Sequence, residues 1–399
     1  MRYLFSLLLY FCTDVIQAKT PVLLISIDGF ANYYLQKYQP KHITFLASTG
    51  TKAEALLPVY PTKTFPNHLS IITGKYPQQH GIIHNKFYHK DLNKVYSLGA
   101  GKDNSAWLTA NPIWEAVEKQ GLKSALYFWP ESQAKGRLAS QFFPYNGNTP
   151  NKDRVEQVIT WLKLPKNEQP SFITLYFSTV DSAAHIFGID SPELEQAVQS
   201  IDNEIGRLLE GIDGVPVNLL LVSDHGMTAS GKQYSILWRN ITPFPLDGHM
   251  INGETQLYFY ANNNADTVNI RSQFIKAKGA NKRYRVYTKG NYPKHWHFSQ
   301  DNSPVLPDLI IDAIPPYTFV NEADNANAGK ATHGYDLLLA KSLEAIFIAK
   351  GPDIKSGVTI KAFENVYIYS IISRLLGLTT TKDIIYSESL LLQLFNFNN

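Results

Sequence analysis

Cysteine is almost absent from this sequence. The 399 residues include one cysteine, Cys12, which lies close to the N-terminus. A single cysteine cannot form a disulfide within the chain, so the hydrophobic core and any bound metal must hold the fold together. If the N-terminal segment is cleaved, no cysteine remains, which suits a bacterial periplasm or medium better than an animal extracellular protein.

The chain also has little excess charge of either sign. It carries 37 basic and 34 acidic residues, a formal net charge of +3. Proteins that wrap nucleic acid present a strongly basic surface, and this sequence provides no basis for one. We therefore expect no binding of nucleic-acid duplexes. With 44% hydrophobic and 18% charged residues, the composition is that of a globular protein.

Long apolar runs are missing as well, and the clearest short one is N-terminal. Arg2 precedes an apolar stretch from Leu4 to Phe11, and Ala18 offers a small-residue cleavage point. This is the anatomy of a secretory signal peptide, and the stretch is too short to span a bilayer. We predict a signal peptide over residues 1–18, a periplasmic or secreted protein, and no membrane-spanning segment after cleavage. The alternative is a buried first strand or an uncleaved anchor.

Apolar runs of strand length recur along the rest of the chain, at residues 22–27, 172–177, 217–222, 309–311 and 345–349. Helical patterns lie between them, at 113–120 and 191–209. Runs that are apolar throughout are typical of strands buried on both faces of a mostly parallel sheet. Their alternation with helices predicts a doubly wound α/β/α sandwich.

The segment 243–327 mixes Tyr, Asn, Lys and Pro without a clear period. We expect it to be a small, less regular lobe inserted beside the site and not a separate folding unit. Residues 19–399 would then form one catalytic domain, which we expect to be a monomer.

Six residues of metal-binding types follow predicted strands or lie in polar loops: Asp28, Asp181, His185, Asp224, His225 and His333. In a parallel sheet the carboxyl ends of neighbouring strands meet at one edge, where ligands bind. Asp181 and His185 are four residues apart, so a helix would place them on one face. Converging carboxylates repel unless cations offset them, and nitrogen and oxygen ligands without sulfur favour zinc. Taken singly, such pairs more often cap turns or face solvent.

The run from Tyr60 to His68 (Tyr-Pro-Thr-Lys-Thr-Phe-Pro-Asn-His) predicts a helix that begins close to Thr64. Backbone N–H groups at a helix N-terminus bind anions, so a phosphoryl group beside Thr64 would be well held. A threonine hydroxyl becomes a good nucleophile once a base or a metal ion ionises it. We predict that Thr64 is the nucleophile; the alternative is a plain N-cap threonine.

Three further residues are candidates for substrate contacts. Asn85 could donate its amide to a developing phosphoryl oxygen. Phe65 and Tyr145 could stack on the two faces of a base. The alternatives are a turn asparagine and aromatic rings that only pack.

Together these residues resemble the nucleotide pyrophosphatase/phosphodiesterase family of the alkaline phosphatase superfamily. The resemblance extends from Pro21 to Leu378, and the run from Pro61 to His68 is its most specific part. Asp28-Gly29, Asp224-His225-Gly226-Met227 and Thr332-His333-Gly334-Tyr335-Asp336 follow in the order typical of the family. The resemblance implies an alkaline phosphatase-like α/β/α sandwich.

It also implies two zinc ions and a covalent phosphothreonine intermediate. One zinc, which activates the nucleophile, would be held by Asp28, Thr64, Asp224 and His225. The second, which activates water, would be held by Asp181, His185 and His333. The phosphoryl oxygen would be bound by Asn85 and the N–H of Thr64, and a nucleobase would be clamped by Phe65 and Tyr145. In one departure, Ala184 precedes His185 where the family usually has glycine.

Related proteins offer rival interpretations. A sulfatase needs a Cys/Ser-x-Pro-x-Arg sequence, which Thr64 to Asn67 do not supply. A phosphonate hydrolase could share the threonine and both metals, whereas a phosphomonoesterase usually has an arginine clamp, and no arginine is near Thr64 or Asn85 in sequence. A choline-type or lysophospholipid diesterase and a non-catalytic exported binding protein are also compatible with these residues. We predict hydrolysis of phosphodiester or pyrophosphate bonds, with nucleotides as substrates.

Overall fold

The sheet at the centre of the molecule has eight strands in the order β19-β2-β18-β9-β1-β8-β6-β7. Their bounds are β1 (Val22–Ile27), β2 (Thr51–Ala53), β6 (Ser124–Tyr127), β7 (Gln141–Phe143), β8 (Phe172–Phe177), β9 (Asn218–Val222), β18 (Phe347–Lys350) and β19 (Val358–Ile360). All run in one direction except β18, which is antiparallel to β9 and β2. The prediction of a mostly parallel sheet is confirmed.

This computed structural model describes residues 19–137, 139–242, 246, 248–279, 282–298, 303–322 and 329–396. The predicted signal peptide, residues 1–18, lies outside the described residues. None of the helices in the described part of the chain combines the length and the hydropathy needed to cross a membrane.

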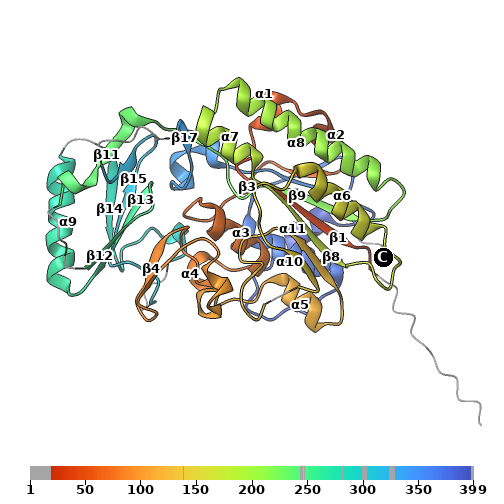
Figure 1. Ribbon diagram of the computed structural model, residues 1–399, viewed down its shortest axis with the longest axis horizontal. Helices are drawn as coiled ribbons and strands as arrows, with labels where there is room; N and C mark the ends of the chain where they lie inside the picture. Colours follow the sequence, from red (N-terminus) through yellow and green to blue (C-terminus); the bar gives the residue numbers. More distant parts are fainter. Residues whose placement is uncertain are drawn as a thin grey trace, which may run out of the picture.

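Helices cover both faces of the sheet (Figure 1). One layer contains α1 (Tyr34–Tyr38), α2 (Lys41–Thr49), α6 (Asn151–Leu162), α7 (Thr179–Phe187) and α8 (Pro192–Gly211). The other contains α3 (Thr64–Thr73), α4 (Pro77–His80), α5 (Ile113–Lys119), α10 (Ile368–Leu376) and α11 (Glu388–Leu394). Along β1, Leu23 and Ile25 pack in the first layer, and Val22 and Leu24 pack in the second. Both faces of the strand are buried, and its residues are apolar except for Ser26.

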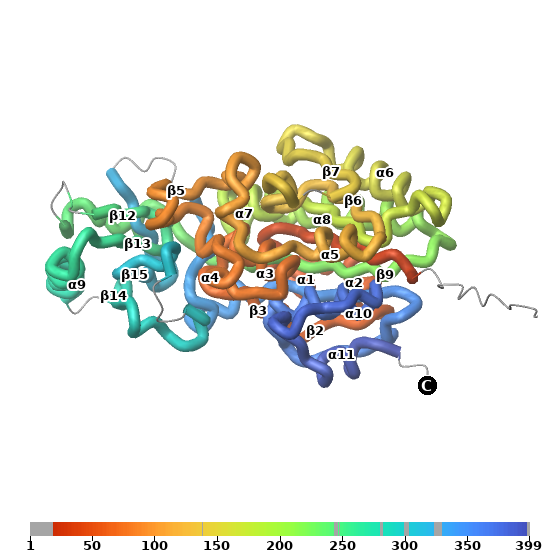
Figure 2. Tube along the Cα trace, turned by 90° about the horizontal axis from the view of Figure 1, so that it is seen from below, coloured from red at the N-terminus to blue at the C-terminus, as the bar shows by residue number. Residues whose placement is uncertain are grey.

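A lobe with its own sheet lies at one end of the molecule (Figures 1 and 2). Its antiparallel strands are β12 (Gly248–Asn252), β13 (Gln256–Ala261), β15 (Leu309–Ala313) and β14 (Tyr284–Thr288), in that order. Helix α9 (Asn264–Lys278) covers the outer face through Ile270 and Phe274. The lobe expected beside the site is present, but it contains a regular four-stranded sheet where the sequence predicts a less regular segment. Its predicted bounds, 243–327, stay a prediction.

The prediction that the run 309–311 joins the parallel sheet is also wrong, because these residues form β15 in the lobe. The run is apolar throughout for a reason of its own. Leu309 and Ile311 face the core under α9, whereas Ile310 faces the core of the main body. The lobe sheet is thus buried on both faces, which sequence alone does not distinguish from a central parallel strand.

Short strand pairs complete the described structure. They are β3 (Leu56–Leu57) with β20 (Phe363–Glu364), β4 (Phe87–His89) with β5 (Lys94–Tyr96), β10 (Thr228–Ala229) with β17 (Ala331–Thr332), and β11 (Ser235–Leu237) with β16 (Thr318–Val320). The last pair is part of the lobe, because Ile236 of β11 and Phe319 of β16 pack in the core under α9.

A buried polar junction joins the lobe to the segment that precedes α3. The Tyr60 hydroxyl and the Gln256 amide both donate to Asp312 Oδ1, each at 2.9 Å. Tyr60 also stacks on Trp296, with ring centroids 3.7 Å apart. Burial raises the pKa of Asp312 to about 7, against the opposite effect of the two hydrogen bonds. Asp312, which accepts from both Tyr60 and Gln256, therefore holds the lobe next to the loop that leads to Thr64.

We expect Asp312→Asn to flatten the pH dependence of unfolding. The pKa of Asp312 is about 7 in the folded protein, against an ordinary value of 3.8. The protonated carboxyl therefore adds to the free energy of unfolding in full below pH 3.8, and this contribution is lost as pH rises through about 7. The slope removed is about 1.4 kcal/mol per pH unit within that window. Denaturant unfolding of both proteins between these pH values measures it. Parallel curves for the two proteins would contradict a protonated Asp312.

Candidate metal and phosphoryl-binding site

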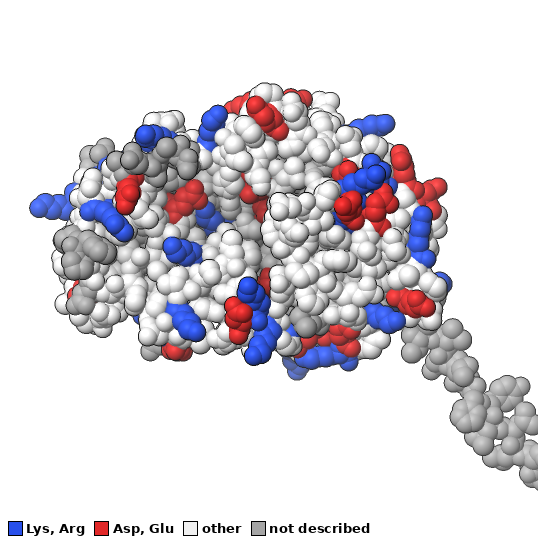
Figure 3. All heavy atoms as spheres, viewed as in Figure 1, with Lys and Arg blue, Asp and Glu red and all other residues white. Residues whose placement is uncertain are grey.

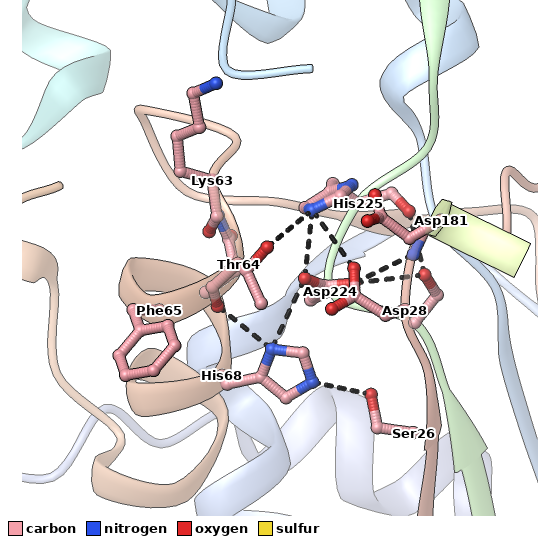
Figure 4. Close-up of polar contacts among 12 residues, drawn as sticks. Ser26, Asp28, Lys63, Thr64, Phe65, His68, Asp181, Asp224 and His225 are labelled. Atoms are coloured by element: carbon pink, nitrogen blue, oxygen red, sulfur yellow. Dashed lines mark hydrogen bonds and ion pairs between the residues drawn. The ribbon is translucent and has the colours of Figure 1, made fainter. Parts of the chain in front are cut away.

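Three aspartates gather at the carboxyl ends of three neighbouring strands, β9, β1 and β8. Asp28 directly follows β1, Asp224 follows β9 after one residue, and Asp181 lies in the first turn of α7 after β8. The parallel register of these strands brings the three side chains to one edge of the sheet (Figure 4). The sequence prediction places them together, and the structure does so too.

Each aspartate has one carboxylate oxygen that is buried without a hydrogen-bond partner among the described residues: Asp28 Oδ1, Asp181 Oδ1 and Asp224 Oδ2. The other oxygens of two of them are anchored. The Tyr176 hydroxyl donates to Asp28 Oδ2 at 2.6 Å, and the Gly29 N–H donates to Asp224 Oδ1 at 3.2 Å. Burial, followed by repulsion from Asp224 and Asp181, holds the pKa of Asp28 well above its usual range. Buried carboxylate oxygens without a hydrogen-bond partner are stabilised by a nearby cation, so these three oxygens indicate a cation-binding site.

Three histidines direct the same ring nitrogen at these oxygens. In each, Nδ1 lies against a backbone carbonyl: Ala331 for His185 (2.9 Å), Gly226 for His225 (3.0 Å) and Thr62 for His333 (2.8 Å). A carbonyl oxygen only accepts, so Nδ1 carries the proton and Nε2 presents its lone pair.

The Nε2 atoms lie close to the aspartate oxygens. His225 Nε2 is 3.0 Å from Asp224 Oδ2 and 3.4 Å from Asp28 Oδ1. Asp181 Oδ1 is 3.4 Å from His185 Nε2 and 3.8 Å from His333 Nε2. A lone pair that faces a carboxylate oxygen is repelled unless a proton or a metal ion lies between the two atoms. The donor set therefore fits divalent metal ions, and nitrogen and oxygen donors without sulfur suit zinc.

Thr64 lies beside these residues as the first residue of α3. Its Oγ1 is 3.4 Å from His225 Nε2. The first N–H groups of a helix have no partner within it, so this helix start can receive an anion. Asn67, one turn along, is buried and holds the preceding loop through hydrogen bonds to the Pro61 and Lys63 carbonyls at 3.0 and 2.8 Å.

The predicted substrate residues take positions around Thr64. The Phe65 N–H donates to Asn85 Oδ1 at 3.0 Å, so the amide end of Asn85 is the end that can meet a phosphoryl oxygen. Phe65 packs edge-on against Tyr96, with ring centroids 6.4 Å apart. Tyr145 is 52% exposed, and its hydroxyl lies 3.2 Å from Ser178 Oγ, next to the start of α7. Figure 3 shows the hollow on this face, with acidic atoms inside it.

Several known proteins are similar to this chain. A family model described as type I phosphodiesterase / nucleotide pyrophosphatase matches residues 22–336. The chain belongs to the type I phosphodiesterase/nucleotide pyrophosphatase family. It is 35% identical over 385 residues to ectonucleotide pyrophosphatase/phosphodiesterase family member 1 of Mus musculus, covering 90% of this chain and 41% of that protein. It is 35% identical over 376 residues to venom phosphodiesterase of Naja atra, covering 90% and 44%.

The chain spans about two fifths of the length of these curated relatives. Among solved structures it is similar to murine ectonucleotide pyrophosphatase/phosphodiesterase 5, with a TM-score of 0.85 and 26% identity, over 94% of this chain and 100% of that one. An inactive threonine-to-alanine variant of the murine protein, in complex with AMP, gives a TM-score of 0.85 and 25% identity, with the same coverage. The expected alkaline phosphatase-like fold is confirmed.

His68 belongs to this site, although sequence reasoning missed it. Its Nδ1 donates to the Thr64 carbonyl at 2.9 Å and is 3.3 Å from Asp224 Oδ2, while its Nε2 is 2.8 Å from Ser26 Oγ (Figure 4). Because Nδ1 carries the proton, His68 offers no lone pair to a metal near Asp224, so it is a positioning residue. The sequence feature that could have identified His68 is its position four residues after Thr64, which places both residues on one face of the helix.

His68→Ala should lower kcat by about 10- to 100-fold while metal content stays unchanged, because Asp224 and Thr64 lose a shared support. His68→Asn should recover a large part of that loss, since its amide can replace the Nδ1–H donor. Steady-state kinetics and metal analysis of the three proteins provide the measurement. If His68→Ala and His68→Asn lower kcat equally, the hydrogen bond from Nδ1–H is not the contribution of His68.

Proposed function

We propose that this chain is a zinc-dependent hydrolase that cleaves phosphodiester or pyrophosphate bonds, with nucleotides as its substrates. The observation that carries the proposal is the position of Thr64. Its hydroxyl lies at a helix N-terminus and 3.4 Å from His225 Nε2, the nitrogen that also lies 3.4 Å from Asp28 Oδ1 and 3.0 Å from Asp224 Oδ2. A hydroxyl placed among metal ligands and anion-binding N–H groups suits nucleophilic attack on phosphorus.

We propose two zinc sites with distinct ligand sets. One would be formed by Asp28, Thr64, Asp224 and His225, and the other by Asp181, His185 and His333. When bound, the two cations would favour ionisation of the attacking oxygens and offset the charge of the phosphoryl group. Distances support this division: His225 Nε2 lies 3.0 Å from Asp224 Oδ2, whereas Asp181 Oδ1 lies 3.4 Å from His185 Nε2 and 3.8 Å from His333 Nε2.

The reaction would proceed in two displacements. Thr64 Oγ1 forms a bond to phosphorus as the bond from phosphorus to the leaving oxygen breaks; the threonine proton is lost and the leaving oxygen gains one. Water then attacks the phosphothreonine, the bond to Oγ1 breaks, and the threonine regains a proton. The net result is one diester and one water converted to a monoester and an alcohol. Asn85 and the Thr64 N–H would hold the phosphoryl oxygen throughout.

Family membership and the AMP complex of the murine protein support nucleotides as the substrates. Phe65 and Tyr145 would hold the base by stacking. The apolar N-terminal segment supports export to the periplasm or the medium. We further propose that residues 19–399 act as one catalytic domain and as a monomer.

The proposal is tested with nitrophenyl esters of thymidine monophosphate and of phosphate. Wild-type protein should cleave the nucleotide diester faster than the monoester, because a monoester brings an extra negative charge to a site with no arginine near Thr64 or Asn85 in sequence. Thr64→Ala should lower diester turnover by roughly 10³-fold or more.

The matched control is metal content. Thr64→Ala should keep its zinc, because three other ligands of that site and the whole second set remain. Faster monoester cleavage would identify a phosphomonoesterase instead. Undiminished diester hydrolysis by Thr64→Ala would rule out the covalent intermediate, and a wild-type protein that binds zinc without turnover would favour a binding protein.

A further inference from the structure

A polar pocket of about 710 Å³ lies between the body and the lobe, next to the proposed nucleophile. Lys63 and Asn85 form part of its wall on the body side, and the turn from Asn252 to Glu254 and strand β16 form part of its wall on the lobe side. Its size is that of a pocket for a nucleoside-sized group. The two walls come from segments far apart in sequence, so no local motif marks the pocket.

The pocket lies on the side of the Asp181, His185 and His333 set. The Lys330 N–H donates to the His185 carbonyl at 2.8 Å, and the adjacent Gly329 lines the pocket. Thr255, next to Glu254, places Oγ1 3.5 Å from the His333 carbonyl. Tyr145 instead lies at the start of α7, beside the core strands. Because Phe65 and Tyr145 would hold the base elsewhere, this pocket can receive the leaving group, which lies on the other side of the phosphorus.

Lys63 would be the natural partner for a charged leaving group, but its charge is already paired. Its Nζ lies 2.9 Å from Glu254 Oε2, and its side chain is only 5% exposed. Figure 4 shows this side chain pointing away from the aspartates. Burial opposes ionisation of Glu254, yet the Lys63 ammonium holds the pKa of Glu254 below its usual range. Glu254 is therefore an anion at neutral pH.

The backbone holds Glu254 in this position. Its φ of +76° is in the left-handed region, which glutamate rarely adopts. The Asn252 side chain accepts from the Glu254 N–H at 2.8 Å, and the Glu254 carbonyl accepts from the Phe319 N–H at 2.7 Å. These backbone hydrogen bonds fix the position of Glu254, and a glutamate at a conformation that favours glycine makes its carboxylate a candidate for a functional role.

The other lining residues that the structure describes give the pocket no net positive charge. Lys86 and Glu322, both exposed, offset each other, as Lys63 and Glu254 do. Burial lowers the pKa of His84 to about 3, so this ring is neutral. The other polar groups are uncharged hydrogen-bonding side chains from Asn85, Ser230, Asn252, Thr318 and Asn321. Such walls suit hydroxyl groups better than a polyanion.

We propose that this pocket receives the leaving group, and that the Lys63–Glu254 ion pair makes the enzyme favour an uncharged, hydroxyl-rich leaving group such as a nucleoside over pyrophosphate. The inference rests on the proposed function and assigns Glu254 as a residue that determines specificity. Removing the carboxylate would free the Lys63 charge for an anionic leaving group, whereas in the wild type that charge is neutralised.

The test compares two substrates that transfer the same adenylyl group: ATP, which releases pyrophosphate, and the dinucleoside monophosphate ApA, which releases adenosine. The measured quantity is the ratio of kcat/KM for ATP to kcat/KM for ApA, relative to the wild-type ratio, so that the different intrinsic reactivities cancel. Glu254→Gln should raise this ratio about fivefold, as expected for release of one partly exposed ion pair.

Two further variants complete the design. Glu254→Gly suits the positive φ, removes the same carboxylate, and should shift the ratio in the same direction. Glu54→Gln removes an ion pair of equal length, 2.9 Å to Lys361, away from the pocket and should leave the ratio unchanged. If both Glu254 variants keep the wild-type ratio, the specificity inference is overturned while the proposed function stands. If the wild type cleaves neither substrate nor the nitrophenyl diester, the proposed function itself fails.

Discussion

Mutual repulsion among three closely placed carboxylates is the constraint on which this structure depends. Asp28, Asp181 and Asp224 each present an oxygen that has no hydrogen-bond partner among the described residues, and all three lie at one edge of the sheet. A protein can keep such a group ionised only by placing positive charge among the oxygens. In each histidine Nδ1–H donates to a backbone carbonyl, so Nε2 is the ring nitrogen that faces the carboxylate oxygens and can bind a metal ion placed among them.

The rest of the fold holds this arrangement in place. Parallel pairing of β9, β1 and β8 aligns the strand ends, and burial of β1 between two helical layers fixes its position. Helix α3 brings Thr64 to the same edge, and His68 ties the Thr64 carbonyl to Asp224. The lobe contributes from the other side, where Gln256 bonds both Asp312 and the carbonyl next to His333. The contacts that position the site residues therefore also hold the lobe against the body.

Much of this could be predicted from the sequence. Apolar runs that end in aspartate predicted the sheet and its active edge, and a helix start predicted the place of Thr64. What failed depended on tertiary contacts: Leu309–Ile311 is apolar because two different cores cover the lobe sheet, and periodicity does not separate that case from a central strand. Glu254 and His68 were missed since their partners, Lys63 and Asp224, are more than 150 residues away in sequence.

Whether cations hold these carboxylates together can be measured by anomalous X-ray scattering at the zinc absorption edge, from crystals grown with zinc. Two peaks are expected, one among Asp28, Thr64, Asp224 and His225, and one among Asp181, His185 and His333. Crystals that bind zinc elsewhere on the protein, or that show no peak among these side chains, would contradict a metal-centred site.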